Sequence, residues 1–302
     1  MNAGIMLQLQ ITMFIILAVG IICTKIKVFT AIGRKTVTDI FIDIMIPSSI
    51  ISAFRKSFSF ETLEKGLWMA AAYTCTLTFC WLIGKVAYRN VEHSKQGILK
   101  YATIISNAQF MGFPIIQAIM GEEGLVLASM AMIPGSIFTW TVALGQFTKI
   151  NRYEGLKNTL LHPCFCSVII GICLGLFRVP LYSGIYAALE YLGSCVMPVS
   201  MLIIGSILSE VNLKSILDWK LYYFSIIRLL AIPLTMFFVF SIVKIDPSVR
   251  NTIVLMSAMP AGTVTAILAE KHEADAQFAS CLIFISTLLS IITLPCLLIF
   301  LF

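Results

Sequence analysis

Apolar stretches long enough to cross a membrane recur from one end of this chain to the other. A helix needs about 20 apolar residues to span a hydrocarbon core of about 30 Å. The chain is 59% hydrophobic and only 12% charged, whereas an average soluble domain carries about 25% charged residues. The composition therefore excludes a water-soluble fold and predicts an all-α polytopic membrane protein.

Hydrophobic runs and their charged or turn-forming boundaries predict ten membrane-spanning helices. The first run has no basic residue ahead of it, so we expect a retained helix rather than a signal peptide. The ten predicted spans lie near residues 5–24, 38–54, 66–87, 99–119, 125–148, 159–177, 184–208, 221–243, 249–268 and 277–301.

The basic residues are distributed unevenly between alternate loops. Of the 21 Lys and Arg residues, Arg228 lies inside the eighth predicted span and fourteen share one side. Because basic loops stay in the cytoplasm, we expect an integral protein of the cytoplasmic membrane with both termini outside. Basic residues in short loops between spans do not predict nucleic-acid binding. The six on the other side are Arg55, Lys56, Lys65, Arg178, Lys244 and Arg250.

The two halves of the chain align with each other at one constant offset of 151 residues. Each half would contain five spans, an odd number, so the second half would enter the membrane from the opposite face. The sequence therefore predicts an inverted repeat of two five-helix units, residues 1–150 and 151–302. The offset aligns identical residues, among them Gly20 with Gly171, Pro47 with Pro198, Ser106 with Ser257 and Glu122 with Glu273.

Two predicted spans contain residues that interrupt a helix near the middle of the membrane. The fourth carries Asn107, Gln109, Gly112 and Pro114, and the ninth carries Met259-Pro260-Ala261-Gly262-Thr263. Proline removes an amide donor and clashes with the preceding turn, and glycine weakens a helix further. Paired interruptions of this kind are typical of binding sites in secondary transporters. Each one alone is also explained as a proline kink relieved by neighbouring helices.

We expect a substrate site where the two interruptions meet. The half-helices after Pro114 and Gly262 would direct amide groups and positive dipole ends to one point, an arrangement that favours an anion. The predicted substrate-binding residues are Asn107, Gln109, Phe110, Gly112, Pro114, Met259, Pro260, Gly262 and Thr263.

Three short motifs occur in this chain in a characteristic order. They are the stretch from Ser106 to Pro114 with Gly121, then Ala258-Met259-Pro260-Ala261, and finally Ser286-Thr287-Leu288-Leu289-Ser290 with Pro295. In these motifs, over essentially its whole length, the chain resembles the auxin efflux carrier family in its short bacterial form. It departs from the plant auxin carriers where Met259 and Ala261, rather than asparagine, flank Pro260.

The resemblance implies a ten-helix carrier in which spans 4 and 9 cross at their breaks. It also implies that spans 1, 2, 6 and 7 form a scaffold, that spans 3–5 and 8–10 form a moving transport domain, and that the protein is a homodimer. Substrates of the family include auxin and small carboxylates such as malate or malonate.

Two charged residues lie inside predicted spans at similar depths. Asp43 is in the second span and Arg228 in the eighth, so the two side chains are candidates for an ion pair with a coupling or gating role. Arg228 is also a candidate countercharge for the anion. The plainer interpretation is that Arg228 snorkels to the lipid headgroups and Asp43 faces water.

These observations predict a secondary active transporter, not an enzyme, that moves a small organic anion by alternating access. The anion would be a mono- or dicarboxylate, auxin-like or malate-like, and coupling to protons or sodium is left open; no cofactor or metal is expected. One alternative is a sodium-coupled carrier of the bile-acid transporter type. An alternative of another class is a membrane prenyltransferase that holds magnesium with Asp39 and Asp43, but the later spans carry no second acidic cluster.

Overall fold

The computed structural model describes residues 3–147, 157, 159–177, 179–211 and 215–301. Within these ranges the elements are helices, together with one isolated antiparallel bridge between Ser106 and Ala261. The predicted boundary between the halves at residues 150 and 151, the end of the fifth predicted span at residue 148, and Arg178 lie outside the described residues.

The first half of the chain forms helices that are repeatedly interrupted. The α1 helix (Ala3–Lys25) is followed by a continuous run of α2 (Ala31–Ile40), the π-helical turn η1 (Phe41–Met45) and α3 (Ile46–Ser57). Then come α4 (Phe60–Ala87), α5 (His93–Ile104), the π turn η2 (Ala108–Gly112), α6 (Phe113–Phe138), the π turn η3 (Thr139–Ala143) and the short 3-10 turn η4 (Leu144–Gln146).

The second half is built in the same manner. Its described elements are α8 (Pro163–Leu176), α9 (Ser183–Ser194), α10 (Val196–Leu208), α11 (Trp219–Ile226), the π turn η6 (Ile227–Ala231), α12 (Ile232–Ile242), α13 (Pro247–Ser257), α14 (Val264–Lys271) and α15 (Ala276–Leu301).

Seven helical stretches of the described chain are long and apolar enough to cross a membrane. The all-helical membrane class is therefore confirmed, whereas the count of ten spans stays a prediction. The three missing spans have separate physical origins, and the predicted sixth span is the shorter helix α8, of 14 residues. The predicted ninth span is divided into α13 and α14, and the predicted fourth and fifth spans merge through a kink at Gly121, whose φ of 68° favours glycine.

Three prolines account for three of the π turns. Pro47, Pro114 and Pro233 each stand at the second residue of the helix that follows η1, η2 and η6. A proline ring clashes with the carbonyl four residues earlier, and one extra residue in the preceding turn moves that carbonyl aside. The sequence thus introduces local widening at three places where a regular helix would be strained.

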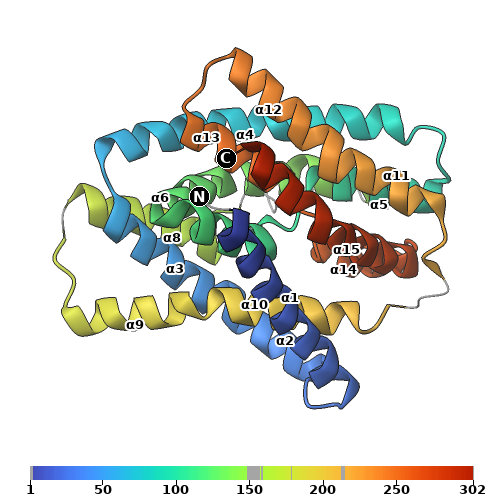
Figure 1. Cartoon of the computed structure of the whole chain (residues 1–302), viewed down its shortest axis with the longest axis horizontal. Helices are drawn as coiled ribbons and strands as arrows, with labels where there is room; N and C mark the ends of the chain where they lie inside the picture. Colours follow the sequence, from blue (N-terminus) through green and yellow to red (C-terminus); the bar gives the residue numbers. More distant parts are fainter. Residues whose placement is uncertain (1–2, 148–156, 158, 178, 212–214, 302) are drawn as a thin grey trace.

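The helices pack as two groups (Figure 1). In the first group α1 lies against α10, and α3 lies against α8 and α9. In the second, α4 packs on α5 and α6, α12 on α13, and α15 on both α11 and α14. The main contacts between the groups are those of α3 with α6, of η2 with α10 and of α1 with α15. The two groups are therefore joined through a limited set of helix pairs.

Small residues allow close packing within the first group. A Cβ atom added to Gly20 would lie 2.5 Å from the carbonyl oxygen of Leu202, and one added to Gly205 would overlap the carbonyl oxygen of Leu17. Helices in membranes associate closely through such small residues, because lipid provides no hydrophobic driving force between them.

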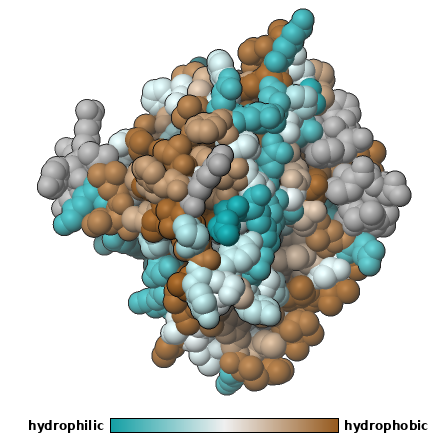
Figure 2. Space-filling view, turned by 90° about the vertical axis from the view of Figure 1, so that its left-hand side faces the viewer, coloured by the Kyte–Doolittle hydropathy of each residue, from teal (hydrophilic) through white to brown (hydrophobic). Residues whose placement is uncertain are grey.

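The surface agrees with a membrane protein. Figure 2 views the molecule from one end and shows a hydrophilic band through the middle of this face, with hydrophobic surface on both sides. Large apolar side chains such as Ile15, Ile22, Leu67, Phe238 and Ile292 are exposed along the helices. A solvent of lipid stabilises this surface, whereas water would not.

We expect the substitution Gly205→Val to separate α1 from α10 and to destabilise the protein by about 1–3 kcal/mol, the usual cost of overpacking a tight interface. The melting temperature of the purified protein in detergent measures this effect. The control Ala18→Val adds similar volume to an exposed position of α1, and equal melting temperatures for the two variants would contradict the close packing.

Candidate functional site

The two interrupted helices meet and cross at their breaks. The α5 helix ends at Ile104 and the chain becomes extended at Ile105, while α13 ends at Ser257 and α14 begins at Val264. The amide of Asn107 donates to the carbonyl oxygen of Pro260 at 2.9 Å. The amide of Gly262 in turn donates to the carbonyl oxygen of Ile105 at 3.2 Å. We call the two segments, residues 105–107 and 258–263, the crossover.

The residue types of the crossover explain its geometry. Gly262 has no side chain where a Cβ atom would lie 3.2 Å from the Ile105 carbonyl oxygen and 3.3 Å from that of Ser106. Pro260 lacks an amide hydrogen and contributes only its carbonyl, which accepts from Asn107. Glycine and proline therefore let the two backbones approach within hydrogen-bonding distance.

Two serines satisfy further polar groups of the crossover. The amide of Ala261 donates to Oγ of Ser286 in α15 at 3.2 Å, and Oγ of Ser106 donates to the Met256 carbonyl oxygen at 3.2 Å. Ser286 was not among the predicted site residues, although it lies in one of the motifs that identified the family. The α15 helix carries five hydroxyl residues, so the sequence alone does not single out Ser286; they are Ser280, Ser286, Thr287, Ser290 and Thr293.

One buried donor at the crossover has no partner. The side chain of Asn107 is 2% exposed, and its Nδ2 donates to no described residue. A buried amide without a hydrogen bond costs about 1–3 kcal/mol, and a ligand or a bound water would remove this cost. The hydroxyls of Thr265 in α14 and Thr287 in α15 are buried without a described partner as well.

Two helix N-termini begin at the crossover. Asn107 precedes η2 and Thr263 precedes α14, and neither side chain caps its helix. The first amide groups of a helix have no partner within it, and they carry a partial positive charge. Together with Asn107 Nδ2 they form a set of donors suited to an anion.

The remaining predicted site residues surround the crossover at different distances. Gly112 contacts Met259, since a Cβ atom on the glycine would lie 3.2 Å from the methionine Cγ. Phe110 stacks on Phe41 of η1, with ring centroids 4.8 Å apart, and thereby joins the two helix groups.

The other two predicted residues point elsewhere. Half-buried Gln109 donates from Nε2 to the Cys164 sulfur at 3.6 Å, so it faces α8. Pro114 is buried in the first turn of α6. Gln109, Phe110 and Pro114 thus lie beside the crossover rather than in it.

Arg228 does not reach the lipid headgroups. Its side chain is 2% exposed, so the interpretation that it snorkels is wrong. Nε donates to the carbonyl oxygen of Met259 at 3.0 Å, and Nη1 donates to that of Thr103 at 2.8 Å. The reason is that carbonyls freed by the breaks offer the guanidinium better partners than lipid does.

Asp43 is exposed on η1 and forms no ion pair with Arg228 in the described structure. Asp39, the other aspartate of the prenyltransferase alternative, is also exposed and lies one turn earlier on α2. In the described ranges, no group of three His, Cys, Asp or Glu side chains has the geometry to hold a metal ion.

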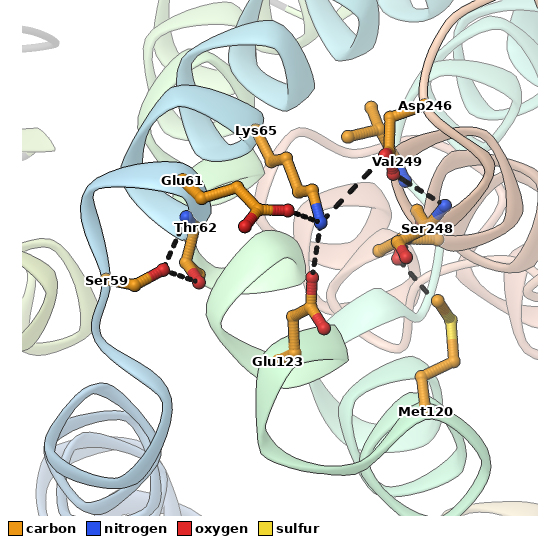
Figure 3. Close-up of polar contacts among 10 residues, drawn as sticks. Ser59, Glu61, Thr62, Lys65, Met120, Glu123, Asp246, Ser248 and Val249 are labelled. Atoms are coloured by element: carbon orange, nitrogen blue, oxygen red, sulfur yellow. Dashed lines mark hydrogen bonds and ion pairs between the residues drawn. The ribbon is translucent and has the colours of Figure 1, made fainter.

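A cluster of charges lies at the end of the helices that is predicted to face outside (Figure 3). Lys65 Nζ lies 2.8 Å from Glu61, 3.2 Å from Glu123 and 3.9 Å from Asp246. This cluster joins α4 to the kink of α6 and to the start of α13. A pocket of about 410 Å³ beside it is lined mainly by residues 61–68 and 243–246, away from the crossover.

A second lysine links the two helix groups. Nζ of Lys56, at the end of α3, lies 2.7 Å from Glu190 of α9 and 3.3 Å from Glu122, which follows the kink of α6. In the structure Glu190 shares this lysine with Glu122, on the face where the first group meets the second.

We expect Gly262→Val to force the two segments of the crossover apart, because its side chain would meet the carbonyl oxygens of Ile105 and Ser106. Stability should fall by about 1–3 kcal/mol, and amide hydrogen exchange should increase in residues 105–107 as well as in 258–263. The control Ile267→Val shortens an exposed side chain of α14. A change confined to residues 258–263 would contradict the hydrogen-bonded crossing.

A family model described as membrane transport protein matches residues 5–157 and 146–298, two stretches that overlap in the middle of the chain. The chain is 28% identical over 272 residues to an uncharacterized transporter of Methanocaldococcus jannaschii, covering 86% of this chain and 87% of the relative. It is 27% identical over 296 residues to an uncharacterized transporter of Methanothermobacter thermautotrophicus, covering 94% and 95%.

These matches extend over almost the whole chain and include both interrupted helices. They agree with the apolar helices of the structure and make the protein an integral membrane transporter. The resemblance noted in the sequence is thereby confirmed, and the chain belongs to the membrane transport protein family of auxin efflux carriers.

Proposed function

We propose that the protein is a secondary active carrier that moves a small organic anion across the cytoplasmic membrane by alternating access. The carboxylate of the substrate docks at the crossover. The single observation that carries this proposal is the buried, unpartnered Nδ2 of Asn107, held where two segments of broken helix hydrogen-bond to each other.

The direction of the crossover segments supports the predicted architecture. The bridge between Ser106 and Ala261 is antiparallel, so the two interrupted helices run in opposite directions at this point. Opposed half-helices are what an inverted five-plus-five repeat would bring together at the middle of the membrane. Within this proposal the chain has ten spans with both termini outside, and it works as a homodimer.

The packing supports different roles in transport for the two helix groups. The first group, with α1, α3, α8, α9 and α10, corresponds to the scaffold, and the second, which contains the crossover, corresponds to the moving transport domain. Alternating access requires the contacts between the groups to break and reform. The ion pair between Lys56 and Glu122 is one such contact, and the stacking of Phe41 on Phe110 is another.

Most of the crossover is buried in this conformation. Asn107, Pro260 and Gly262 are buried, as are the apolar side chains of Met259 and Phe110, while Ile105 and Ser106 are half-buried. Water is excluded from such a site, and hydrogen bonds to a charged ligand are therefore stronger than they would be at the surface. In this proposal the conformation is an occluded state, from which the substrate leaves when the helix groups move.

Replacing Asn107 by alanine should weaken substrate binding about tenfold to a hundredfold, since a hydrogen bond to a charged group contributes about 1.5–3 kcal/mol. Proteoliposomes are assayed with the carboxylate that most raises the melting temperature of the purified protein in a screen of mono- and dicarboxylates. Gln109→Ala should have a smaller effect, because Gln109 faces Cys164 rather than the crossover.

The matched control is Asn90→Ala, which removes the same amide group from an exposed turn after α4. All variants must show the folded yield of the unmodified protein. Unchanged transport by Asn107→Ala would reject the assignment of the site.

Transport should not depend on a sodium gradient. Sodium prefers several converging oxygen ligands, but Gln109 faces α8, which leaves Ser106, Asn107 and Thr263 as the side chains of the crossover that carry an oxygen. Initial uptake rates are compared in sodium and in choline media at constant ionic strength. Loss of uptake without sodium would favour the alternative of a sodium-coupled carrier of the bile-acid transporter type.

A further inference from the structure

We propose that Arg228 gives the crossover its net positive charge and so makes the site selective for an anionic group over a neutral one of the same shape. This inference rests on the proposed function and deepens it, since it defines the docking group as a single carboxylate. Arg228 acts as a positioning residue through the crossover backbone, and the structure shows no sign that it must touch the substrate.

The guanidinium is attached to both interrupted helices. Nη1 binds the carbonyl oxygen of Thr103, in the last turn of α5, and Nε binds that of Met259, just beyond the end of α13. These are the C-terminal ends of the two half-helices that enter the crossover. Helix C-termini carry free carbonyls and a partial negative charge.

The charge of Arg228 has no carboxylate partner. Among the described residues no Asp or Glu lies within 4.0 Å of its nitrogens. Nη1 also contacts the Cys80 sulfur at 3.8 Å, and Nη2 donates to no described residue. The ionisable groups around it are Cys80, Tyr73 and Tyr88, all from α4 or its C-cap. Arginine stays protonated under all ordinary conditions, so a positive charge is buried here without a counterion.

The net charge of the crossover is the sum of the partial charges at its four helix ends and the charge of Arg228. Each helix end carries about half an elementary charge, positive at the N-terminus and negative at the C-terminus. The two N-termini, before η2 and α14, and the two C-termini, of α5 and α13, therefore cancel to about zero. Arg228 adds one positive charge, which leaves the crossover with a net charge of about +1.

A net charge of about +1 in a poorly screened site needs one negative charge to balance it. A monovalent carboxylate supplies that charge and also accepts hydrogen bonds from Asn107 Nδ2 and the free helix amides. In a dicarboxylate, one carboxylate would dock in this manner and the other would lie outside the crossover. A neutral amide of equal size would leave the guanidinium uncompensated.

A purely structural role would also explain the two hydrogen bonds, so the test must separate charge from structure. Arg228→Gln retains donors but removes the charge. Arg228→Lys retains the charge but loses the fork that reaches two carbonyls. A structural role predicts that both variants lose stability while their relative preference for anions is unchanged.

Binding to purified protein is measured by calorimetry for indole-3-acetate, benzoate and malonate, each against the corresponding amide. We expect Arg228→Gln to reduce the preference for carboxylate over amide about tenfold or more, because one close charge shifts such equilibria by at least this factor. Arg228→Lys should keep most of the preference. The control Arg250→Gln removes an arginine from the outer end of α13 and should leave the preference unchanged.

The outcomes distinguish this inference from the proposed function. If the unmodified protein binds none of the carboxylates better than its amide, the proposed anion site itself fails. If it does prefer carboxylates and Arg228→Gln keeps the same preference, only the role of Arg228 is overturned.

A second measurement decides the matter if Arg228→Gln does not fold. A buried lysine releases its proton more easily than an exposed one, whereas arginine does not. In Arg228→Lys the carboxylate affinity should therefore fall as the pH rises from 6 to 9, while the unmodified protein keeps a constant affinity over this range. If Arg228→Lys has already lost the preference for carboxylate over amide at pH 6, where the lysine is charged, the inference is overturned.

Discussion

The structure depends on one constraint, which is that lipid cannot satisfy backbone polar groups. Wherever a helix is broken inside the membrane, its free amides and carbonyls must find partners in the protein. Here the two breaks are each other's partners, because Asn107 donates to Pro260 and Gly262 donates to Ile105. The crossover is therefore more than a place where two helices pass, since each interruption is stabilised by the presence of the other.

The same constraint explains the position of the polar side chains. Ser286 accepts from Ala261, and Arg228 donates to carbonyls at the ends of both entering half-helices. After these groups are satisfied, Asn107 Nδ2 and the N-terminal amides of η2 and α14 remain. The buried hydroxyls of Thr265 and Thr287, which also have no partner among the described residues, lie in the neighbouring helices α14 and α15. The proposed docking of a carboxylate rests on the donors in this set.

The proposed movement requires the contacts between the two helix groups to break and reform while each group stays together. Within the first group, Gly20 and Gly205 bring α1 and α10 into backbone contact. Between the groups the contacts include an aromatic stack and an ion pair, namely Phe41 with Phe110 and Lys56 with Glu122. Exposed ion pairs contribute little free energy, so the pair of Lys56 with Glu122 can break and reform at small cost, whereas the aromatic stack is buried.

The sequence by itself determined the membrane class, the positions of the two interruptions and the family, because length, hydropathy, proline and glycine act locally. It could not determine which groups the interruptions would bind, since those partners lie about 150 residues away in the chain. Only the tertiary structure decided that Arg228 turns inward, that Asp43 does not pair with it, and that Gln109 faces α8 rather than the crossover. The physical reason is that a buried polar side chain turns toward free backbone groups with which it can form hydrogen bonds. The packing of helices that are distant in the sequence decides where those backbone groups lie.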